Sequence, residues 1–298
     1  MDTSFLCNLC PRECNVDRGL GKTGFCKVPN HIKVARAALH FWEEPCISGE
    51  EGSGTVFFSG CNLRCVYCQN RKIAEGVYGK IITVDRLAAI FLDLQKQGAN
   101  NINLVTPSHY VLQIVKALNL AKEQGLLIPV VYNSSAYESV ETLKKLEGYV
   151  DVYLPDFKYM DEELGRKYSN AGNYSEIAKK AIAEMVRQVG NAQFDSRGIL
   201  KKGVVVRHLV LPGYTADSKE IIKYLYDTYG NSIYISIMSQ FTPILGLENY
   251  PELQRKLTEK EYDEVVDFAI ELGVENGFIQ EGDVAKESFI PDFDGQGV

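Results

Sequence analysis

After about residue 50, the chain alternates short runs rich in β-branched residues with longer stretches in which apolar residues recur at helical spacing. This alternation is typical of repeated βα units. The run Val204-Val205-Val206 is apolar without interruption, as expected for a parallel strand covered on both faces. We expect six strands, at residues 55–59, 101–105, 128–132, 150–154, 204–211 and 233–239.

Amphipathic helices are expected to follow these strands. In the first helix Leu87 and Leu94 share one face, Thr83 or Asp85 caps the start, and Gly98 ends it. Six units are too few for a closed eight-unit barrel, so we expect an α/β fold with a partial (β/α)6 barrel of the TIM type, whose active site lies at the C-terminal strand ends. The helices are expected near residues 83–98, 111–118, 139–146, 177–189, 218–229 and 258–272.

The segment before the barrel has a different composition. Residues 1–50 are rich in cysteine and glycine, whereas the βα pattern occupies residues 51–298. All eight cysteines fall in the first quarter of the chain, and in a chain of this length that distribution favours metal ligation over disulfides. We therefore expect an N-terminal cysteine-rich metal-binding segment, residues 1–50, followed by the barrel, residues 51–298.

Charge and hydropathy exclude several classes of protein. The formal charge of -7 argues against a sequence-independent nucleic-acid binder, which would need a basic surface. No run approaches the roughly 18 apolar residues that cross a bilayer. The N-terminus, MDTSFLCNLCPREC, lacks the basic and apolar regions of a signal peptide. We expect a cytoplasmic protein with no nucleic-acid or membrane partner.

Cys61, Cys65 and Cys68 form a C-x3-C-x2-C triplet that begins two residues beyond the first predicted strand. Three thiolates can hold three corners of a 4Fe–4S cluster, whose usual ligand set is four, so one iron stays open to an exogenous ligand. The alternative is a zinc clip, but structural zinc sites are closed and usually combine paired C-x2-C units.

The run Cys-Asn-Leu-Arg-Cys-Val-Tyr-Cys, followed by Gln69 and Asn70, resembles the cluster loop of radical S-adenosylmethionine (SAM) enzymes. In that family SAM occupies the open iron, and an electron from the cluster splits it into methionine and a 5′-deoxyadenosyl radical. The resemblance implies a 4Fe–4S cluster, SAM, a low-potential electron donor such as flavodoxin or ferredoxin, and an anaerobic cell. It also places Tyr67 against the adenine of SAM, and the alternative is a tyrosine packed beneath the loop.

The next two strand ends carry short polar side chains that suit SAM. After strand two, Thr106 and Ser108 stand where many family members have a Gly-Gly-Glu turn that receives the SAM amino group, and their hydroxyls can accept from an ammonium. His109 is a candidate proton donor or ligand, and the alternative, which we expect, is that it caps the following helix or faces solvent. After strand three, Asn133 and Ser135 are candidates for the ribose hydroxyls, although such residues also initiate turns.

Strands four and five add charge. Asp156 and Lys158 resemble an Asp-x-Lys element of enzymes that activate glycyl radical proteins. The resemblance implies that Asp156 contacts the ribose of SAM and that Lys158 contacts the SAM carboxylate. An exposed ion pair is the alternative. Arg207 matches an arginine that faces the SAM pocket in those enzymes. Because a buried guanidinium requires an anionic partner, either SAM or an internal carboxylate must serve it.

Four further cysteines have the spacing C-x2-C-x3-C-x11-C, and this segment is too short to hold a core of its own. A second metal site is therefore expected at Cys7, Cys10, Cys14 and Cys26. Zinc and an auxiliary iron–sulfur cluster both accept four thiolates, and the spacing does not separate them.

Cys46, in the run Trp-Glu-Glu-Pro-Cys, is the one cysteine left over. Neighbouring carboxylates would raise its thiol pKa, so it is a candidate hydrogen-atom donor rather than a thiolate nucleophile. The alternative is a small buried apolar residue. Glu43 and Glu44 either position a cationic substrate or form a solvated turn.

The resemblance extends from about residue 51 to residue 240, and the whole chain is similar to relatives of pyruvate formate-lyase activating enzyme. It implies a radical SAM oxidoreductase that abstracts hydrogen from a small-molecule or peptide substrate. We expect the N-terminal segment to cover the barrel mouth, which favours a small substrate or a short peptide. The alternatives are an activating enzyme for a glycyl radical protein, a non-catalytic iron–sulfur redox sensor, and a structural zinc scaffold.

Overall fold

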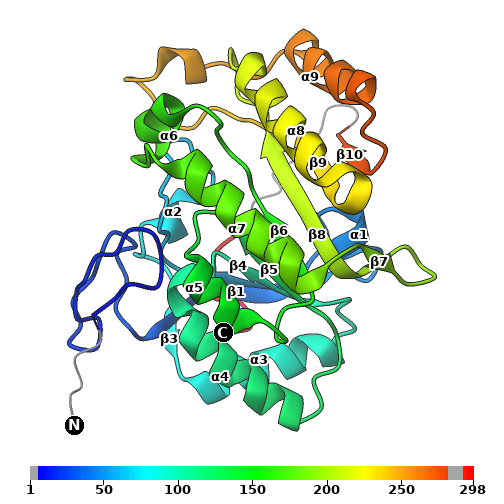
Figure 1. The fold of residues 1–298 in the computed structure, drawn as a ribbon. Coiled ribbons are helices and arrows are strands. Elements are labelled where there is room, and N and C mark those ends of the chain that lie inside the picture. The colour runs from blue at the N-terminus through cyan, green and yellow to red at the C-terminus, as the bar shows by residue number, and fades with distance from the viewer. Residues whose placement is uncertain (1–5, 281–290) are drawn as a thin grey trace.

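The computed structural model describes residues 6–280 and 291–298 (Figure 1). All six predicted strands are present, and neighbouring members of the set pair in parallel. They are β2 (Ser53–Phe58), β4 (Ile102–Val105), β5 (Val130–Ser134), β6 (Val152–Pro155), β8 (Leu200–Leu209) and β9 (Tyr234–Met238). The expected partial barrel is therefore confirmed.

Further strands extend the sheet, whose order is β10-β9-β8-β6-β5-β4-β2-β1-β3. The strand β1 (Ile32–His40) comes from the cysteine-rich segment and pairs antiparallel with β2. This strand was not predicted, because its alanines and basic residues have low strand propensity. The other added strands are two or three residues long: β3 (Lys80–Ile82), β7 (Gln193–Phe194) and β10 (Gly277–Ile279).

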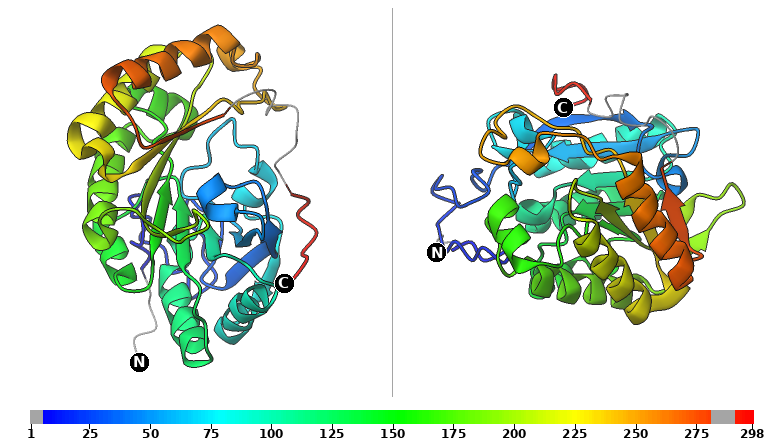
Figure 2. Two further views of the ribbon diagram at one scale, coloured as in Figure 1. Left: turned by 90° about the vertical axis from the view of Figure 1, so that its right-hand side faces the viewer. Right: turned by 90° about the horizontal axis from the view of Figure 1, so that it is seen from above.

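Helices cover the convex side of the curved sheet, as Figures 1 and 2 show. The hydroxyl of Thr83 accepts the backbone N–H of Arg86, so Thr83 is the cap of the first predicted helix. The predicted helices correspond to α3 (Val84–Lys96), α4 (Val111–Glu123), α5 (Val140–Leu143), α7 (Tyr174–Val189), α8 (Thr215–Tyr229) and α9 (Glu259–Leu272). Within residues 6–280, three α-helices were not predicted: α1 (Pro45–Ser48), α2 (Arg71–Ala74) and α6 (Glu162–Ser169).

The central strands are buried on both faces, as predicted. Val204 and Val206 belong to the large core under the helices, whereas Val205 belongs to a smaller apolar cluster inside the barrel. Cys46 and Ile47 of α1 fill that inner cluster. The segment before β2 therefore closes the floor of the barrel.

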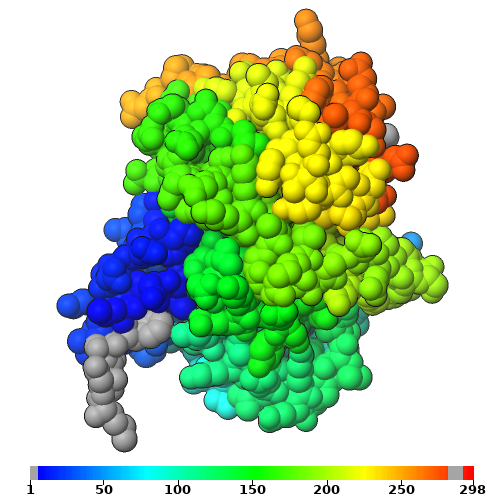
Figure 3. Space-filling view, viewed as in Figure 1, coloured from blue at the N-terminus to red at the C-terminus, as the bar shows by residue number. Residues whose placement is uncertain are grey.

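Residues 6–31 lie against the flank of the barrel, in dark blue in Figures 1 and 3. Arg18 Nη1 donates to the carbonyl of His109 (2.6 Å), and Arg12 Nε donates to the carbonyl of Asn62 (2.8 Å). No residue of this segment lines the cavity described below. The part of the predicted segment that borders the cavity is its end, at His40, Trp42 and Glu43, so residues 6–31 do not cover the barrel mouth as expected.

The last described residues run along β1, as both views of Figure 2 show. Gln296 accepts the backbone N–H of Ala37 at 2.9 Å, and Phe293 packs edge-on against Phe57 with 5.5 Å between ring centroids. Pro291 reaches the wall of the cavity. Among the described residues, no helix has both the length and the apolar character that a membrane crossing requires.

Candidate active site

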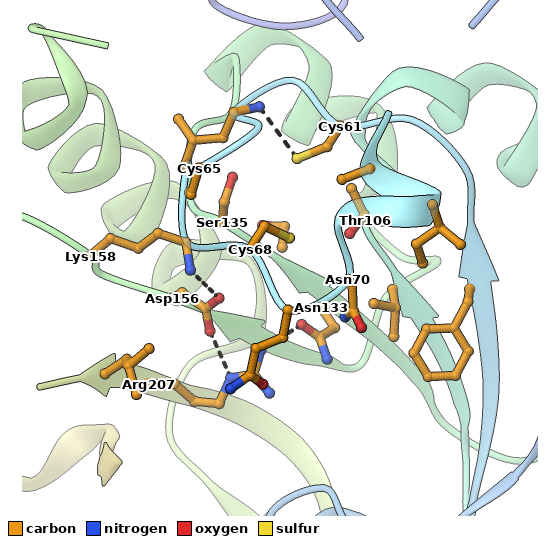
Figure 4. A pocket seen from close by; sticks show the side chains of 18 of the residues that line it. Cys61, Cys65, Cys68, Asn70, Thr106, Asn133, Ser135, Asp156, Lys158 and Arg207 are labelled. Atoms are coloured by element: carbon orange, nitrogen blue, oxygen red, sulfur yellow. Dashed lines mark hydrogen bonds and ion pairs between the residues drawn. The ribbon is translucent and has the colours of Figure 1, made fainter. Parts of the chain in front are cut away.

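A cavity of about 260 Å³ lies inside the barrel, toward the C-terminal ends of the strands (Figure 4). It collects nearly all of the residues that the sequence nominated for a cluster and SAM. Those that line it are Cys61, Cys65, Tyr67, Cys68, Thr106, Asn133, Ser135, Asp156, Lys158 and Arg207.

The triplet loop follows β2 through Gly60, which has φ +90°. A Cβ at Gly60 would lie 2.7 Å from the carbonyl oxygen of Cys26, so this close approach to the N-terminal segment requires glycine. The sulfur of Cys61 accepts the backbone N–H groups of Leu63 and Arg64, each at 3.4 Å. Burial raises the pKa of Cys61 and raises that of Cys68 to about 12, so a metal must displace the thiol protons.

Asp156, Lys158 and Arg207 form one buried ion-pair network. The Asp156 carboxylate accepts from Arg207 Nε at 2.7 Å and from Lys158 Nζ at 2.8 Å. Burial opposes ionisation of Asp156, but the charges of Arg207 and Lys158 outweigh it and hold the Asp156 pKa below its usual value. The side chains of Asp156 and Lys158 are only 18% and 17% exposed, so the alternative of an exposed pair is wrong.

Glu43 supplies a second anion to this network. Its carboxylate accepts from Arg207 Nη1 at 3.0 Å and from Asn103 Nδ2 at 3.1 Å. Arg207 Nη2 donates to Asn133 Oδ1 at 2.7 Å. Internal carboxylates are therefore the partners that the buried Arg207 required.

The two glutamates before Pro45 do not form a solvated turn, so that expectation is wrong. The Glu43 side chain is 9% exposed. Glu44 accepts from the hydroxyl of Ser236 on β9 (2.9 Å), and burial raises the Glu44 pKa. These contacts tie the segment after β1 to β8 and β9 across the barrel.

Cys46 stands apart from the site. It is buried in the inner apolar cluster with Val131 and Leu200, and it does not line the cavity. Burial first, and then the charge of Glu44, raise its pKa to about 12. The structure favours the small buried apolar residue over the hydrogen-atom donor.

Tyr67 lines the cavity and is also anchored beneath the loop. Its hydroxyl lies 2.7 Å from that of Tyr159. Its ring meets Tyr168 and Phe241 edge-on. The two predicted positions of this residue are therefore compatible, since one edge is anchored while the residue borders the cavity.

Ser108 and His109 do not reach the cavity. The hydroxyl of Ser108 donates to the buried carboxylate of Glu138. The His109 Nε2 lies 2.8 Å from the carbonyl of Ser59, and its side chain caps no helix. Because the N-terminal segment covers this strand end, His109 is buried, and the expectation of a cap or a solvent-facing ring is wrong.

The N-terminal cysteines are neighbours. Cys7, Cys10 and Cys26 are buried, and the charges of Cys26 and Cys7 act on Cys10, whose pKa burial raises to about 12. A Cβ at Gly24 would lie 2.7 Å from the sulfur of Cys14, which explains glycine there. In residues 6–280 and 291–298, no three His, Cys, Asp or Glu side chains converge as tightly as a single metal ion demands.

These side chains fit a 4Fe–4S cluster with SAM. One loop presents three thiols to a cavity that also holds an ammonium, a carboxylate and the hydroxyl of Thr106. Asn70 Oδ1 is buried at this cavity with no hydrogen-bond partner in the described chain, so an acceptor remains for a ligand donor. The sequence did not point to Ser169, whose hydroxyl donates to the Cys65 sulfur (3.0 Å).

Comparison with known proteins agrees with this site. The chain is 30% identical to "Uncharacterized protein MJ0674" of Methanocaldococcus jannaschii over 88% of this chain and 74% of that protein. It is 28% identical to the pyruvate formate-lyase-activating enzyme of Clostridium pasteurianum over 59% of this chain and 68% of that enzyme.

A solved structure shares the fold. SuiB of Streptococcus suis, bound to precursor peptide SuiA, superposes with a TM-score of 0.50 at 14% identity. The match covers 74% of this chain and 46% of SuiB, so the chain spans about half the length of that protein. The profile of the Radical SAM superfamily matches residues 55–225, which is more than half of the chain. This protein therefore belongs to the radical SAM superfamily.

Proposed function

We propose that this protein is an enzyme that cleaves SAM reductively and abstracts hydrogen from a small-molecule or peptide substrate. The observation that carries the proposal is the convergence of the cysteine triplet and the Asp156–Lys158–Arg207 network on one cavity. When bound at Cys61, Cys65 and Cys68, the 4Fe–4S cluster supplies the electron that splits SAM into methionine and a 5′-deoxyadenosyl radical.

The chain's own residues bind and orient SAM. The ammonium of Lys158 takes the SAM carboxylate, the hydroxyl of Thr106 accepts from the SAM amino group, and Tyr67 borders the adenine. Asp156 and Asn133 take the ribose hydroxyls. Ser135 is a further candidate for the ribose, whereas Ser108 is engaged by Glu138 and is not part of the proposal.

Arg207 and Glu43 act as positioning residues. All three guanidinium nitrogens of Arg207 donate hydrogen bonds, Nε to Asp156, Nη1 to Glu43 and Nη2 to Asn133. Arg207 therefore fixes the side chains of Asp156 and Asn133, the two residues proposed to bind the ribose. The Glu43 carboxylate accepts a hydrogen bond from Arg207 Nη1 and offsets the positive charge of Arg207. The two anions and two cations of the network balance, which keeps the site electrically neutral before the ligands bind.

The make-up of the cavity wall supports a small substrate. The segment from His40 to Glu43 and Pro291 form part of its wall, together with apolar residues such as Met238. Such a wall excludes water from a radical and contacts a substrate without reacting with it.

The test is reductive cleavage of SAM by anaerobically reconstituted protein. We expect 5′-deoxyadenosine to accumulate when dithionite-reduced protein meets SAM, as followed by mass spectrometry. Cys65→Ala abolishes the product, whereas the matched control Cys46→Ala, which also removes one thiol, retains it. Product formation that persists in Cys65→Ala would contradict the proposal, and no product from the wild-type protein would favour the redox sensor.

The similarity to the pyruvate formate-lyase-activating enzyme of Clostridium pasteurianum favours a second candidate, an activating enzyme for a glycyl radical protein. This function requires the cavity wall to open for a glycine loop of a partner. It predicts a glycyl radical signal by electron paramagnetic resonance (EPR) on a partner protein, whereas a small substrate predicts a modified metabolite and no such signal.

We further propose that Cys7, Cys10, Cys14 and Cys26 hold an auxiliary iron–sulfur cluster. Zinc would draw four sulfurs around one ion at about 2.3 Å. The described thiols are neighbours without such convergence, as are those of the triplet. Metal and sulfide analysis tests this: replacing all four cysteines by alanine removes about four irons per chain. Loss of one zinc instead would contradict it.

A further inference from the structure

The C-terminal end of α6 packs against the triplet loop. The backbone N–H of Val66 donates to the carbonyl of Tyr168 at 2.8 Å, and the hydroxyl of Ser169 donates to the Cys65 sulfur at 3.0 Å. Cys61, by comparison, accepts two longer bonds from backbone amides of its own loop. Cys65 is therefore contacted by a side chain from a distant helix, 104 residues along the chain.

Two tyrosines extend this contact. The Tyr159 hydroxyl lies 2.8 Å from Ser169 Oγ, and the Tyr67 hydroxyl lies 2.7 Å from that of Tyr159. Because the proton of Ser169 points to the sulfur, the Ser169 oxygen accepts from Tyr159, and Tyr159 in turn accepts from Tyr67. Aligned hydroxyl dipoles of this kind strengthen one another in a buried site.

Arg12 fixes Ser169 from the other side. Its guanidinium donates to the backbone carbonyls of Ser169 (2.9 Å) and Asn170 (2.6 Å), and its Nε donates to the carbonyl of Asn62 (2.8 Å). The carbonyls of Ser169 and Asn170 lie at the C-terminal end of α6, where a cation is favoured. The Phe25 ring stacks 3.8 Å from the guanidinium carbon. Arg12 thus joins the helix end to the triplet loop.

Arg12 also belongs to the N-terminal cysteine site, since it lies between Cys10 and Cys14. Ligation of these two cysteines by one metal group fixes the short loop that carries Arg12. Loss of that group frees the loop, and with it the restraint on Ser169 and Asn62. The chain therefore contains a continuous line of contacts from the N-terminal cysteines to the Cys65 sulfur.

We infer that Ser169 is a positioning residue that raises the reduction potential of the cluster on the triplet, and that Arg12 makes this effect depend on the N-terminal cysteine site. The inference rests on the proposed function. Hydrogen bonds to ligand sulfurs stabilise the more negatively charged reduced cluster and are a main determinant of cluster potential. Removing the Ser169 hydroxyl therefore makes the cluster harder to reduce.

The test is an EPR-monitored redox titration of the reconstituted full chain. Ser169→Ala is expected to shift the midpoint potential of the triplet cluster to a more negative value, and Ser169→Thr, which retains a hydroxyl, to restore it. Ser175→Ala is the matched control, because Ser175 donates to the sulfur of Met160 at 3.2 Å, away from the cluster. It is expected to leave the potential unchanged.

Further variants test the proposed coupling between the N-terminal cysteine site and the cluster potential. Arg12→Gln and Cys14→Ala are each expected to shift the potential in the same direction as Ser169→Ala. The double variant Arg12→Gln with Ser169→Ala is expected to shift it no further than Ser169→Ala alone, because Arg12 acts through Ser169. Strictly additive shifts, or no shift in Arg12→Gln, would overturn the role of Arg12.

Two failures are distinguishable. If the wild-type protein shows no iron–sulfur EPR signal after reconstitution, the proposed function fails and this inference fails with it. If Ser169→Ala binds as much iron as the wild type and has the same potential, the inference alone is overturned.

Discussion

Glu43 offers a direct test of the ion-pair network that lines the cavity. Its carboxylate lies 3.0 Å from Arg207 Nη1 with 9% of the side chain exposed, so Glu43→Ala leaves a buried guanidinium short of one anion. Breaking a buried ion pair costs about 3–5 kcal/mol. Arg207 retains Asp156 and Asn133, so we expect the lower end, about 3 kcal/mol. Glu43→Gln keeps an acceptor oxygen, and we expect a loss of about 1 kcal/mol.

Thermal unfolding followed by circular dichroism measures the difference. At about 2 °C per kcal/mol for a chain of this size, the midpoint falls by about 6 °C in Glu43→Ala and about 2 °C in Glu43→Gln. Glu51→Ala is the control, because Glu51 pairs with Arg197 at 3.0 Å on the surface, and its midpoint is expected to be unchanged. Equal midpoints for the alanine variants of Glu43 and Glu51 would refute the assignment of Glu43 as a buried counterion.

Three further outcomes are expected. Burial raises the pKa of Glu138 to about 7, so the native state holds a proton that the unfolded state releases near its usual value. Stability therefore falls as the pH rises between these two values, and Glu138→Gln flattens that dependence in unfolding midpoints taken at pH 5 and pH 8. Gly60→Ala forces a Cβ against the carbonyl of Cys26, so the iron content after reconstitution falls, and a normal content would contradict the stated need for glycine. Lys158→Met is expected to weaken SAM binding, measured by calorimetry, roughly 10- to 150-fold, because a hydrogen bond to a charged group contributes about 1.5–3 kcal/mol. An unchanged affinity would show that Lys158 does not bind SAM.

The sequence was sufficient to predict the central sheet. A stretch of strand that is buried on both faces, such as residues 204–206 of β8, is apolar without interruption, and that leaves a signal in a single sequence. By contrast, β1 carries Lys33 and Arg36, and β3 has three residues. Such strands form because a neighbouring strand pairs with them, and the amino-acid composition of the strand itself does not indicate that partner.

The same distinction applies to the site. The triplet and the strand ends were predictable because chemistry and topology bring them to one edge of the barrel. The need of Arg207 for an anion was predictable as well, but 39 acidic residues are available, and Glu43, the second of its two partners, lies 164 residues away. Ser169 gave no signal, since a serine at a helix end is ordinary until tertiary packing sets it beside a sulfur.

The antiparallel strand β1 limits how the barrel can be excised. A fragment that starts at residue 51 loses the strand that pairs with β2, and the backbone groups of β2 then become an open edge at which separate chains can pair and aggregate. The same cut removes Glu43, one of the two carboxylates that pair with Arg207. A soluble fragment that retains the candidate site must therefore begin upstream of Ile32, and one trimmed to the superfamily match alone is expected to precipitate.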